Sequence, residues 1–295
     1  MIDLKSHAGA CLIEIVRDAP IETLGLLLDR RKAVLAPFYD DRYLAELECN
    51  NGISMVLTTP SLLPLVPADR GVATCADPLE SFYALHCRLL EAGHYGASVA
   101  NEIAHDARIH PTAYIADRDV RIGAGTVIGP KAVIEERSII GTNCVIGAGT
   151  VIGAEGFEVR RVSGRQIAVP HGGGVRIGTH VTIQSNSVVD RALFGGCTEI
   201  GDETLIDNLV HVAHAVSIGR RCRIHACVCV NGSTIVGDDV RLGPNATVSS
   251  TLRIGNRAWI SLGAVVTRDV PPDGHVSGNF AVDHERLLTH IRQIR

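Results

Sequence analysis

The fold of this chain is decided by the segment Glu199-Ile-Gly-Asp-Glu-Thr-Leu-Ile-Asp-Asn-Leu-Val-His-Val-Ala-His-Ala-Val-Ser-Ile-Gly219. Within it an Ile or Val recurs at every sixth position, at 200, 206, 212 and 218, and Gly follows the first and the last. A helix repeats every 3.6 residues and a strand every two, so neither alone produces a strict period of six. One short flat strand followed by a corner does, if the aliphatic residue points inward and the small residue after it lets the backbone turn.

The same period runs through most of the second half of the chain. It begins at Ile122, breaks after Ile152, resumes at Ile177 and continues to Val266. Three hexads close a triangular coil of about 18 residues, and successive coils stack in parallel. The sequence therefore predicts a mainly β protein in which residues 103–270 form a parallel β-helix, called the prism below. Its expected inward residues are Ile122, Ile128, Ile134, Ile140, Ile146, Ile152, Ile177, Ile183, Val189, Ile200, Ile206, Val212, Ile218, Ile224, Val230, Val236, Leu242, Val248, Ile254, Ile260 and Val266.

Two segments interrupt the period. Residues 157–174 break it and contain Ser163-Gly164, which favours a β-hairpin or loop that leaves the prism. Leu193 to Glu199 adds five residues between neighbouring hexads. Loops held by a rigid scaffold often carry function, although a neutral surface insertion is the alternative for each. Phe157, at the start of the first insert, is accordingly a candidate substrate contact.

The segments that flank the prism lack the repeat. Residues 1–102 are expected to form a small α/β domain, with short strands at Ile13–Val16 and Met55–Leu57. A helix is expected at Leu79–Ala92, because Asp77-Pro78 supplies an N-cap and a favourable first residue.

The other flank, residues 271–295, is expected to be a tail. Asp269-Val-Pro-Pro-Asp-Gly274 closes the prism, because successive prolines and a glycine cannot continue the coil. Val282–Arg295 is expected to form at most a short basic helix.

Composition narrows the classes of function. The net charge of −4 gives no reason to expect a nucleic acid or an anionic membrane surface as partner. The nine cysteines are odd in number and form no CxxC pair, which argues against a disulfide framework and a structural zinc site. The N-terminus lacks the regions of a signal peptide, and no apolar run reaches the roughly 18 residues of a membrane span. We expect a soluble protein of a reducing cytoplasm.

Two histidines are the best candidates for chemistry. His211 and His214 flank the inward Val212, so both are expected to project outward, His214 at a corner. Neutral imidazole suits a general base, and Gly232, one coil of 18 residues further on, offers a backbone N–H to an oxyanion without a blocking side chain. Asp207-Asn208 is expected to orient the imidazole or an incoming amine. The alternatives are plain surface histidines or a metal site, for which no third ligand at suitable spacing is evident.

An ordered series of motifs sharpens these candidates. It consists of Val151-Ile-Gly-Ala-Glu-Gly-Phe157, Gly174-Val-Arg-Ile-Gly178, Val189-Asp-Arg191, Ile206-Asp-Asn208 and Val212-Ala-His214. The series resembles the UDP-3-O-acylglucosamine N-acyltransferases, hexapeptide-repeat enzymes of lipid A synthesis that take their acyl group from an acyl carrier protein thioester. The resemblance implies a left-handed β-helix and a homotrimer with active sites between neighbouring prisms. It also implies that His214 is the catalytic base and Gly232 the oxyanion donor, while His211 takes part in substrate binding.

The resemblance extends to the first domain. Asp40-Asp-Arg-Tyr43 stands where that family carries its uridine pocket, so Tyr43 is expected to stack on the base and Asp40 to contact the nucleotide. Phe38 or Tyr39 could replace Tyr43 as the aromatic wall, because three rings cluster here in a chain that is poor in them. The alternative is that these rings form the small domain's own core.

The acyl donor and the broader class stay open at this point. Ile254-Gly-Asn-Arg-Ala-Trp-Ile-Ser-Leu-Gly-Ala-Val-Val-Thr-Arg-Asp-Val-Pro-Pro272 and Ser277-Gly-Asn279 resemble the last coils of acetyl-CoA-dependent sugar acetyltransferases. The expected co-substrate is therefore an acyl thioester of either acyl carrier protein or coenzyme A, with no bound cofactor and no metal. The expected acceptor is a nucleotide sugar. A zinc β-helix of the γ-carbonic-anhydrase type, or a purely structural β-helix, is the remaining alternative.

Overall fold

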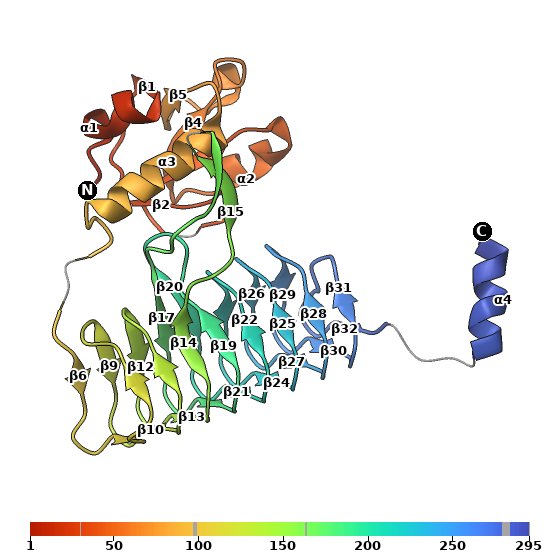
Figure 1. Cartoon of the computed structure of the whole chain (residues 1–295). Helices are drawn as coiled ribbons and strands as arrows, with labels where there is room; N and C mark the ends of the chain where they lie inside the picture. Colours follow the sequence, from red (N-terminus) through yellow and green to blue (C-terminus); the bar gives the residue numbers. More distant parts are fainter. Residues whose placement is uncertain (30, 97–98, 163, 279–283, 295) are drawn as a thin grey trace.

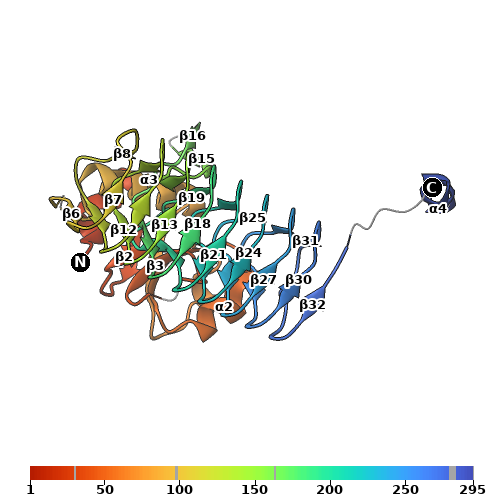
Figure 2. The ribbon, with the colours of Figure 1, turned by 90° about the horizontal axis from the view of Figure 1, so that it is seen from below.

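A computed structural model describes residues 1–29, 31–96, 99–162, 164–278 and 284–294. It shows a long triangular prism with a smaller α/β unit seated over its first coils (Figure 1). Viewed from below, the coils step along one axis from β6 to β32 (Figure 2). The mainly β architecture expected from the period of six is confirmed.

Three parallel sheets form the sides of the prism. We name each side after one of its strands. The β22 face contains β8 (Tyr114–Ile115), β11 (Val133–Ile134), β14 (Val151–Ala154), β19 (Val188–Asp190), β22 (His211–Val212), β25 (Cys229–Val230), β28 (Thr247–Val248) and β31 (Val265–Val266). The β21 face contains β7 (Arg108–Ile109), β10 (Val127–Ile128), β13 (Val145–Ile146), β18 (Thr182–Ile183), β21 (Leu205–Ile206), β24 (Arg223–Ile224), β27 (Arg241–Leu242), β30 (Trp259–Ile260) and β32 (His275–Val276). The β20 face contains β6 (Glu102–Ile103), β9 (Val120–Ile122), β12 (Ser138–Ile140), β17 (Gly174–Ile177), β20 (Cys197–Ile200), β23 (Ser217–Ile218), β26 (Ile235–Val236) and β29 (Arg253–Ile254).

The predicted inward residues fill the prism. Ile206, Val212 and Ile218 are all at most 2% exposed, and the other predicted residues of the series join them in one core cluster. Neighbouring coils stay in register at the inward positions, so that Val189 pairs with Val212 and Val212 with Val230. A position of one coil therefore stacks on the position 18 residues further along wherever the period is unbroken.

The glycine that follows many of the inward residues serves a different purpose from the one we expected. The residue with positive φ at most corners comes three positions after the inward residue and is usually not glycine, as at Leu209 and Ala215. The glycine that follows the inward residue is needed for close stacking instead. A Cβ on Gly201 would lie 2.6 Å from the backbone of Gly219 in the next coil. The small residue thus allows coils to approach rather than the chain to turn.

The first part of the chain is a five-stranded sheet in the order β1-β5-β4-β3-β2, with helices around it. The helix expected at Leu79–Ala92 is α3, and the Asp77 carboxylate accepts the Glu80 N–H at 2.9 Å as its N-cap. Strand β3 was not predicted, because Pro37 interrupts its apolar run, yet every residue of it is buried. The elements are α1 (Leu4–Ala8), β1 (Glu14–Arg17), β2 (Thr23–Leu24), β3 (Val34–Phe38), α2 (Leu44–Cys49), β4 (Ile53–Thr58), β5 (Gly71–Thr74) and α3 (Pro78–Glu91), with 3-10 turns at Gly9–Cys11, Asp41–Tyr43 and Leu63–Leu65.

Both interruptions of the repeat hold this unit on the prism. The first forms the antiparallel hairpin β15 (Val159–Val162) and β16 (Arg165–Ala168), which rises beside α3 (Figure 1); Ser163 lies outside the described residues. The second carries Phe194, whose ring centroid lies 5.2 Å from that of Phe82 on α3. These contacts bury apolar surface between the two units and fix their relative position.

The tail contains helix α4 (His284–Ile294). Residues 282, 283 and 295 of the expected basic helix, and Asn279 of the last quoted motif, lie outside the described residues. Within the described ranges, none of the helices has the length and apolar character needed to cross a membrane.

Candidate active site

The two candidate histidines lie on the β22 face and its following corner. His211 is the outward residue of β22, and the buried Val212 beside it anchors the strand in the core. His214 stands two residues after Val212 in the corner that follows. Because the prism core fixes the backbone on both sides, the two imidazoles are held by a rigid scaffold.

His211 is held by a carboxylate of the preceding coil. Its Nε2 lies 3.0 Å from Oδ2 of Asp190, a residue that is only 4% exposed. This hydrogen bond, followed by contact with Cys229, raises the pKa of His211 to about 10. His211 is therefore a cation at neutral pH and donates from Nε2, so it is suited to hold an anionic group rather than to accept a proton.

His214 has the opposite electrostatics. Its side chain is 17% exposed and its ring centroid lies 5.3 Å from that of His171. Burial lowers the pKa of His214, and the neighbouring His171 lowers it further. Its Nδ1 is buried without a hydrogen-bond partner among the described residues. A neutral imidazole with an unused nitrogen is the form that a general base requires.

Gly232 packs directly under His214. A Cβ on Gly232 would lie 2.7 Å from Cε1 and 2.8 Å from Nε2 of the His214 ring, closer than any side chain tolerates. The Gly232 N–H also has no acceptor among the described residues. The spacing of one coil thus brings the two residues that we singled out into contact.

The first insert covers His214 with a carboxylate. Oε2 of Glu158 lies 3.8 Å from Nε2 of His214, and Oε1 of Glu158 accepts a hydrogen bond from the Tyr83 hydroxyl at 3.2 Å. Arg160 pairs with the same carboxylate at 2.6 Å and stacks over the Tyr83 ring. Burial, followed by Glu158, raises the pKa of Tyr83 to about 12, so this hydroxyl remains a donor. Helix α3 thereby contributes to the surroundings of His214.

A buried histidine completes the cluster. His171 is 2% exposed; its backbone N–H donates to Glu155 at 3.0 Å and its Nδ1 lies 3.0 Å from the Val169 carbonyl. Gly156 is packed between three side chains, because a Cβ there would lie 2.6 Å from Nε2 of His171, 3.2 Å from Cδ2 of His214 and 3.3 Å from Oδ2 of Asp190. This glycine lets the two halves of the site approach each other.

The structure does not bring every predicted residue into this cluster. Asp207 accepts hydrogen bonds from the backbone N–H and the side-chain amide of Asn208, both at 2.7 Å, and Oδ1 of Asn208 accepts the Ser185 N–H at 3.1 Å. These bonds belong to the preceding corner, and in this chain Glu158 and Asp190 are the carboxylates beside the histidines. That Asp207-Asn208 orients an incoming amine stays a prediction.

Phe157 is 84% exposed and borders Gly156, with its ring free to meet a ligand or a second chain. Sequence reasoning missed His171 and Glu158 as site residues, because both lie in the insert, where no period assigns a direction to a side chain. Asp190 was visible as part of the ordered series, but spacing alone gave it no role.

The three aromatic rings of the first domain do not share one environment. Phe38 is fully buried in the domain's core, which corrects its expected use as a substitute wall. Tyr39 is 40% exposed and its ring centroid lies 5.5 Å from that of Tyr43. Asp40 accepts both the backbone N–H and the Nε of Arg42, at 3.0 and 2.9 Å.

This ring pair is electrostatically linked to the histidine cluster. Burial, followed by the Tyr43 hydroxyl, raises the pKa of Tyr39 to about 12, and Arg160 opposes this shift. The same Arg160 pairs with Glu158 beside His214. The charge of Arg160 is therefore felt both at Tyr39 and at the Glu158 carboxylate beside His214.

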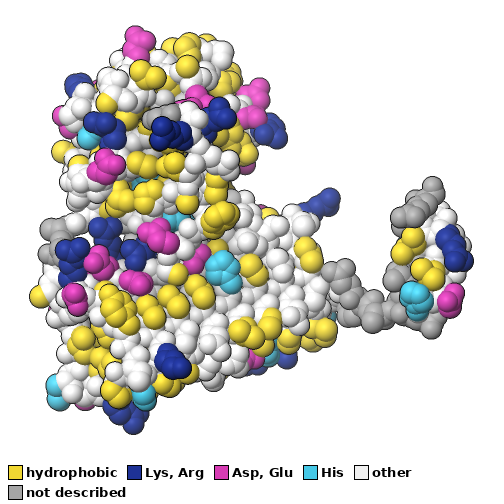
Figure 3. Space-filling view, viewed as in Figure 1, with side chains coloured by type: hydrophobic (Ala, Val, Ile, Leu, Met, Phe, Trp, Pro, Cys, Tyr) yellow, Lys and Arg dark blue, Asp and Glu magenta, His cyan; other side chains and the backbone are white. Residues whose placement is uncertain are grey.

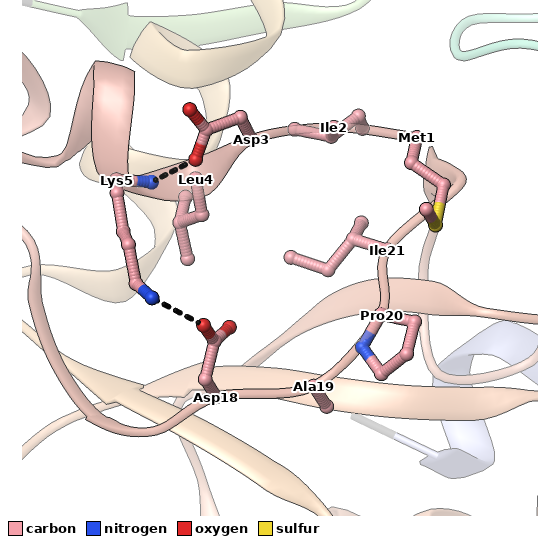
Figure 4. Close-up of a pocket in the computed structure, with 9 residues that line it drawn as sticks. All are labelled: Met1, Ile2, Asp3, Leu4, Lys5, Asp18, Ala19, Pro20 and Ile21. Atoms are coloured by element: carbon pink, nitrogen blue, oxygen red, sulfur yellow. Dashed lines mark hydrogen bonds and ion pairs between the residues drawn. The ribbon is translucent and has the colours of Figure 1, made fainter.

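Two further observations limit what the histidine cluster includes. An open cavity of about 500 Å³ lies at the N-terminus, lined by residues 1–5 and 18–21, with the Lys5–Asp18 ion pair, 2.9 Å, along one side (Figure 4). It includes none of the clustered histidines and carboxylates. Among the described residues, no group of three or more His, Cys, Asp or Glu side chains is arranged to hold a metal ion.

Comparison with known proteins agrees with the repeat. The model of the bacterial transferase hexapeptide (six repeats) matches residues 119–154 and 197–232, and that of the hexapeptide repeat of succinyl-transferase matches residues 233–268. The chain aligns over 66% of its length with a solved UDP-N-acetylglucosamine acyltransferase from Campylobacter jejuni, covering 81% of that chain at 20% identity with a TM-score of 0.51. The fold is thus the expected left-handed parallel β-helix.

Curated relatives are similar to part of this chain. A UDP-3-O-acylglucosamine N-acyltransferase of Caulobacter sp. (strain K31) is 47% identical over 105 residues, which are 36% of this chain and 31% of that protein. One of Janthinobacterium sp. (strain Marseille) is 34% identical over 163 residues, 55% of this chain and 46% of that protein. The chain thus spans less than half the length of these relatives. It is a left-handed β-helix protein built from bacterial transferase hexapeptide repeats, and part of it is similar to the UDP-3-O-acylglucosamine N-acyltransferases.

Proposed function

We propose that this chain is an N-acyltransferase that moves an acyl group from a thioester to the amino group of a UDP-amino sugar, in synthesis of a lipid A type of glycolipid. The observation that carries the proposal is the neutral His214 packed against Gly232, in a chain that is similar over part of its length to UDP-3-O-acylglucosamine N-acyltransferases. Amine acylation needs a base for the nitrogen's proton and donors for the oxyanion, and this pair can provide both.

The roles follow from the electrostatics of the cluster. His214 takes the proton from the sugar amine as the nitrogen attacks the thioester carbonyl. The free Gly232 N–H donates to the oxyanion of the tetrahedral adduct. Glu158 stabilises the imidazolium that His214 becomes, since its carboxylate lies 3.8 Å from Nε2. The cationic His211 binds an anionic or carbonyl oxygen of the substrate.

The nucleotide is assigned to the Tyr39–Tyr43 pair. Two rings with centroids 5.5 Å apart and a partly exposed edge offer a stacking surface for a base. Arg160, which pairs with Glu158 and lowers the pKa of Tyr39, would supply positive charge for a diphosphate. Asp40 would contact the uracil or ribose, as far as its bonds to Arg42 permit.

A homotrimer is proposed because one side of the prism is nearly uncharged. The outward residues of the β20 face include Arg121, Arg176, Glu199 and Arg253. Those of the β22 face carry no charged side chain apart from His211 and the nearly buried Asp190 that binds it, and Figure 3 shows uncharged side chains over much of this side. Such a surface is suited to contact a second copy of the chain. The outward residues of the β22 face are Tyr114, Val133, Val151, Val188, His211, Cys229, Thr247 and Val265.

A trimer that uses this face would place His211 and His214 in the clefts between chains. All nine cysteines are free, which suits the reducing cytoplasm in which such a thioester-dependent enzyme would act.

The donor is proposed to be an acyl carrier protein thioester, with coenzyme A as the second candidate. The last coils favour the second, because residues 233–268 match the hexapeptide repeat of succinyl-transferase and the segment Ile254–Pro272 resembles acetyl-CoA-dependent enzymes. The chemistry at His214 is the same for either donor. The two differ only in what docks outside the cleft.

The proposal is tested by a matrix of donors and acceptors. Purified protein is incubated with acyl carrier protein thioesters or coenzyme A thioesters, together with UDP-3-O-acylglucosamine or a UDP-amino sugar that lacks the 3-O-acyl group. We expect an amide product, detected by mass spectrometry, with at least one combination. Absence of amide from all combinations, with folded protein, would contradict the proposed function.

A further inference from the structure

The two oxygens of the Glu158 carboxylate have different surroundings. Oε1 accepts a hydrogen bond from the Tyr83 hydroxyl at 3.2 Å and pairs with the Arg160 guanidinium at 2.6 Å. Oε2 makes no hydrogen bond within the described residues, and it lies 3.8 Å from Nε2 of His214. The Glu158 side chain is 17% exposed, so a ligand can still reach this oxygen. A charged hydrogen-bond acceptor thus stands open beside the proposed base.

The surroundings of Glu158 fix the direction of this open oxygen. The backbone carbonyl of Glu158 accepts the Val169 N–H at 2.7 Å, just before the hairpin strand β15 begins. Tyr83 on α3 is 1% exposed, and the Arg160 guanidinium lies 5.1 Å from the centre of its ring. Both donors to Oε1 are therefore held against α3, and a site is precise when such supporting contacts hold it. With Oε1 anchored, Oε2 is the oxygen left to meet a ligand.

The gap between Glu158 and His214 matches the two N–H bonds of a primary amine. Oε2 and Nε2 are 3.8 Å apart, so a nitrogen about 2.9 Å from each makes an angle of roughly 80° with them. Bending each N–H by about 13° from its tetrahedral direction accommodates this angle, and hydrogen bonds tolerate such a bend. An amine held in this way donates to both acceptors, and its lone pair remains free to attack a carbonyl.

A hydroxyl cannot satisfy the same two acceptors. It has one hydrogen, so an alcohol at this position leaves either Oε2 of Glu158 or Nε2 of His214 without a donor. A desolvated charged acceptor without a donor is costly, and sites that pair a substrate's N–H or O–H reject analogues that lack it. The other carboxylate beside the histidines is already in use, because Oδ2 of Asp190 is paired with His211 at 3.0 Å.

We propose that Glu158 is the specificity-determining residue that makes this chain acylate an amine rather than a hydroxyl. It binds the amino group of the acceptor sugar together with His214. This inference rests on the proposed function, because it concerns the acceptor of the same reaction. The alternative is that Glu158 serves only the junction between α3 and the hairpin through Arg160, in which case it does not distinguish the two acceptors.

The transfer balances without a further co-reactant. The lone pair of the held amine attacks the carbonyl carbon of the thioester donor, and a C–N bond forms. The proton that the nitrogen loses passes to Nε2 of His214. The C–S bond then breaks, and the leaving thiolate takes this proton from the imidazolium, so that the products are an amide and a free thiol and His214 is again neutral. The second N–H stays on Oε2 of Glu158 throughout.

The decisive variant is Glu158→Gln, because the contacts of Oε1 dictate how the new amide is oriented. Tyr83 and Arg160 are donors, so they hold the amide oxygen of the glutamine and turn its NH₂ group toward His214. A donor then faces the amine of the substrate, whereas the oxygen of a hydroxyl can accept from it. The variant should therefore lose activity with an amine acceptor and keep it with a hydroxyl acceptor.

The first measurement is the ratio of kcat/KM for two acceptors that differ in one group, UDP-3-O-acylglucosamine and UDP-3-O-acylglucose, with the same thioester donor. We expect the amine-to-hydroxyl ratio to fall by about 10- to 100-fold in Glu158→Gln, the range for a hydrogen bond to a charged group. Glu80→Gln is the matched control, because Oε1 of Glu80 also joins α3 to the hairpin by accepting the Gly164 N–H at 3.0 Å. The control should keep the wild-type ratio. An unchanged ratio in folded Glu158→Gln, or its loss in Asp207→Asn alone, would overturn the proposal.

The second measurement, of binding, separates this inference from the proposed function. In titration calorimetry without donor, the wild type should bind UDP-glucosamine more tightly than UDP-glucose, and Glu158→Gln should abolish that preference. If the preference holds but no amide forms with any donor, the proposed reaction is refuted and the amine site stands. If amide forms with the same amine-to-hydroxyl ratio in the wild type and Glu158→Gln, the amine site is refuted and the proposed function stands. Should Glu158→Gln not fold, Glu158→Asp decides, because its shorter side chain withdraws the carboxylate from His214 and should lower the ratio in the same direction.

Discussion

Replacing Gly232 by Ala is the most informative single change to this site. The added methyl would lie 2.7 Å from Cε1 and 2.8 Å from Nε2 of His214. Carbon atoms normally pack about 3.5–4.0 Å apart. The ring must therefore move by roughly 1 Å, and a displacement of that size in a catalytic group costs about 10²-fold in rate. We expect kcat to fall by about that factor.

The structure also explains why this variant should still fold. Gly232 does not have a positive φ, so its backbone conformation is open to alanine. Other coils carry side chains two residues after the inward residue, such as Ala226 after Ile224 and Ser250 after Val248. The cost should thus be confined to the imidazole and its surroundings.

The assay is amide formation by Gly232→Ala under saturating donor and acceptor, with circular dichroism and gel filtration as checks of folding. Ser250→Ala is the matched control, because it changes the same corner one coil further on, where the side chain is exposed. The control should retain wild-type kcat. A folded Gly232→Ala variant with wild-type kcat would refute the contact between Gly232 and a functional His214.

Three further predictions follow from other parts of the molecule. Asp190→Asn should lower the pKa of His211 from about 10, which NMR titration of the imidazole would follow. Because the folded-state pKa is raised, the His211–Asp190 pair stabilises the fold fully below about pH 6.5, and this contribution is lost as the pH rises through 10. The free energy of unfolding of the variant should therefore depend less on pH between these two values. An unchanged His211 pKa would contradict the conclusion that the Asp190 hydrogen bond raises it. Ile224→Asp should prevent folding, since an unpaired carboxylate in the prism core costs several kcal/mol. A cooperative thermal unfolding transition of the variant at the wild-type temperature would contradict this prediction. Tyr43→Ala should raise the KM for the nucleotide sugar far more than it lowers kcat, and an unchanged KM would exclude the ring from base binding.

The period of six was sufficient to predict the prism, because each repeated Ile or Val has one possible direction once the coil is triangular. It also placed His214 against Gly232, since 18 residues make one coil and stacked coils bring equivalent corners together. The same reasoning misjudged the glycine after each inward residue. Gly201 is required by the backbone of the coil above, and only coordinates of two stacked coils reveal that contact.

Residues outside the repeat could not be placed in this way. Glu158 and His171 reach His214 because the insert folds back over the corner, a tertiary arrangement that no local pattern encodes. The loop at Leu193–Glu199 was expected as a possible functional segment, but its Phe194 packs on α3 instead. Strand β3 was hidden by Pro37, which is tolerated although the strand lies between β4 and the short β2.

The central claim is that His214 is neutral at working pH and acts as the general base. Its direct test is the pH dependence of kcat/KM for amide formation by the wild type, His214→Ala, His211→Ala and His225→Ala. His225 directly follows the inward Ile224 of β24 and serves as a histidine at another corner of the prism. We predict that the wild type loses activity as pH falls through one ionisation below the ordinary histidine value of about 6.5. His214→Ala should lose about 10²- to 10⁴-fold in kcat and lack that ionisation, while His211→Ala loses less and keeps it. Wild-type kcat in folded His214→Ala, with activity abolished in His211→Ala or His225→Ala, would contradict the account.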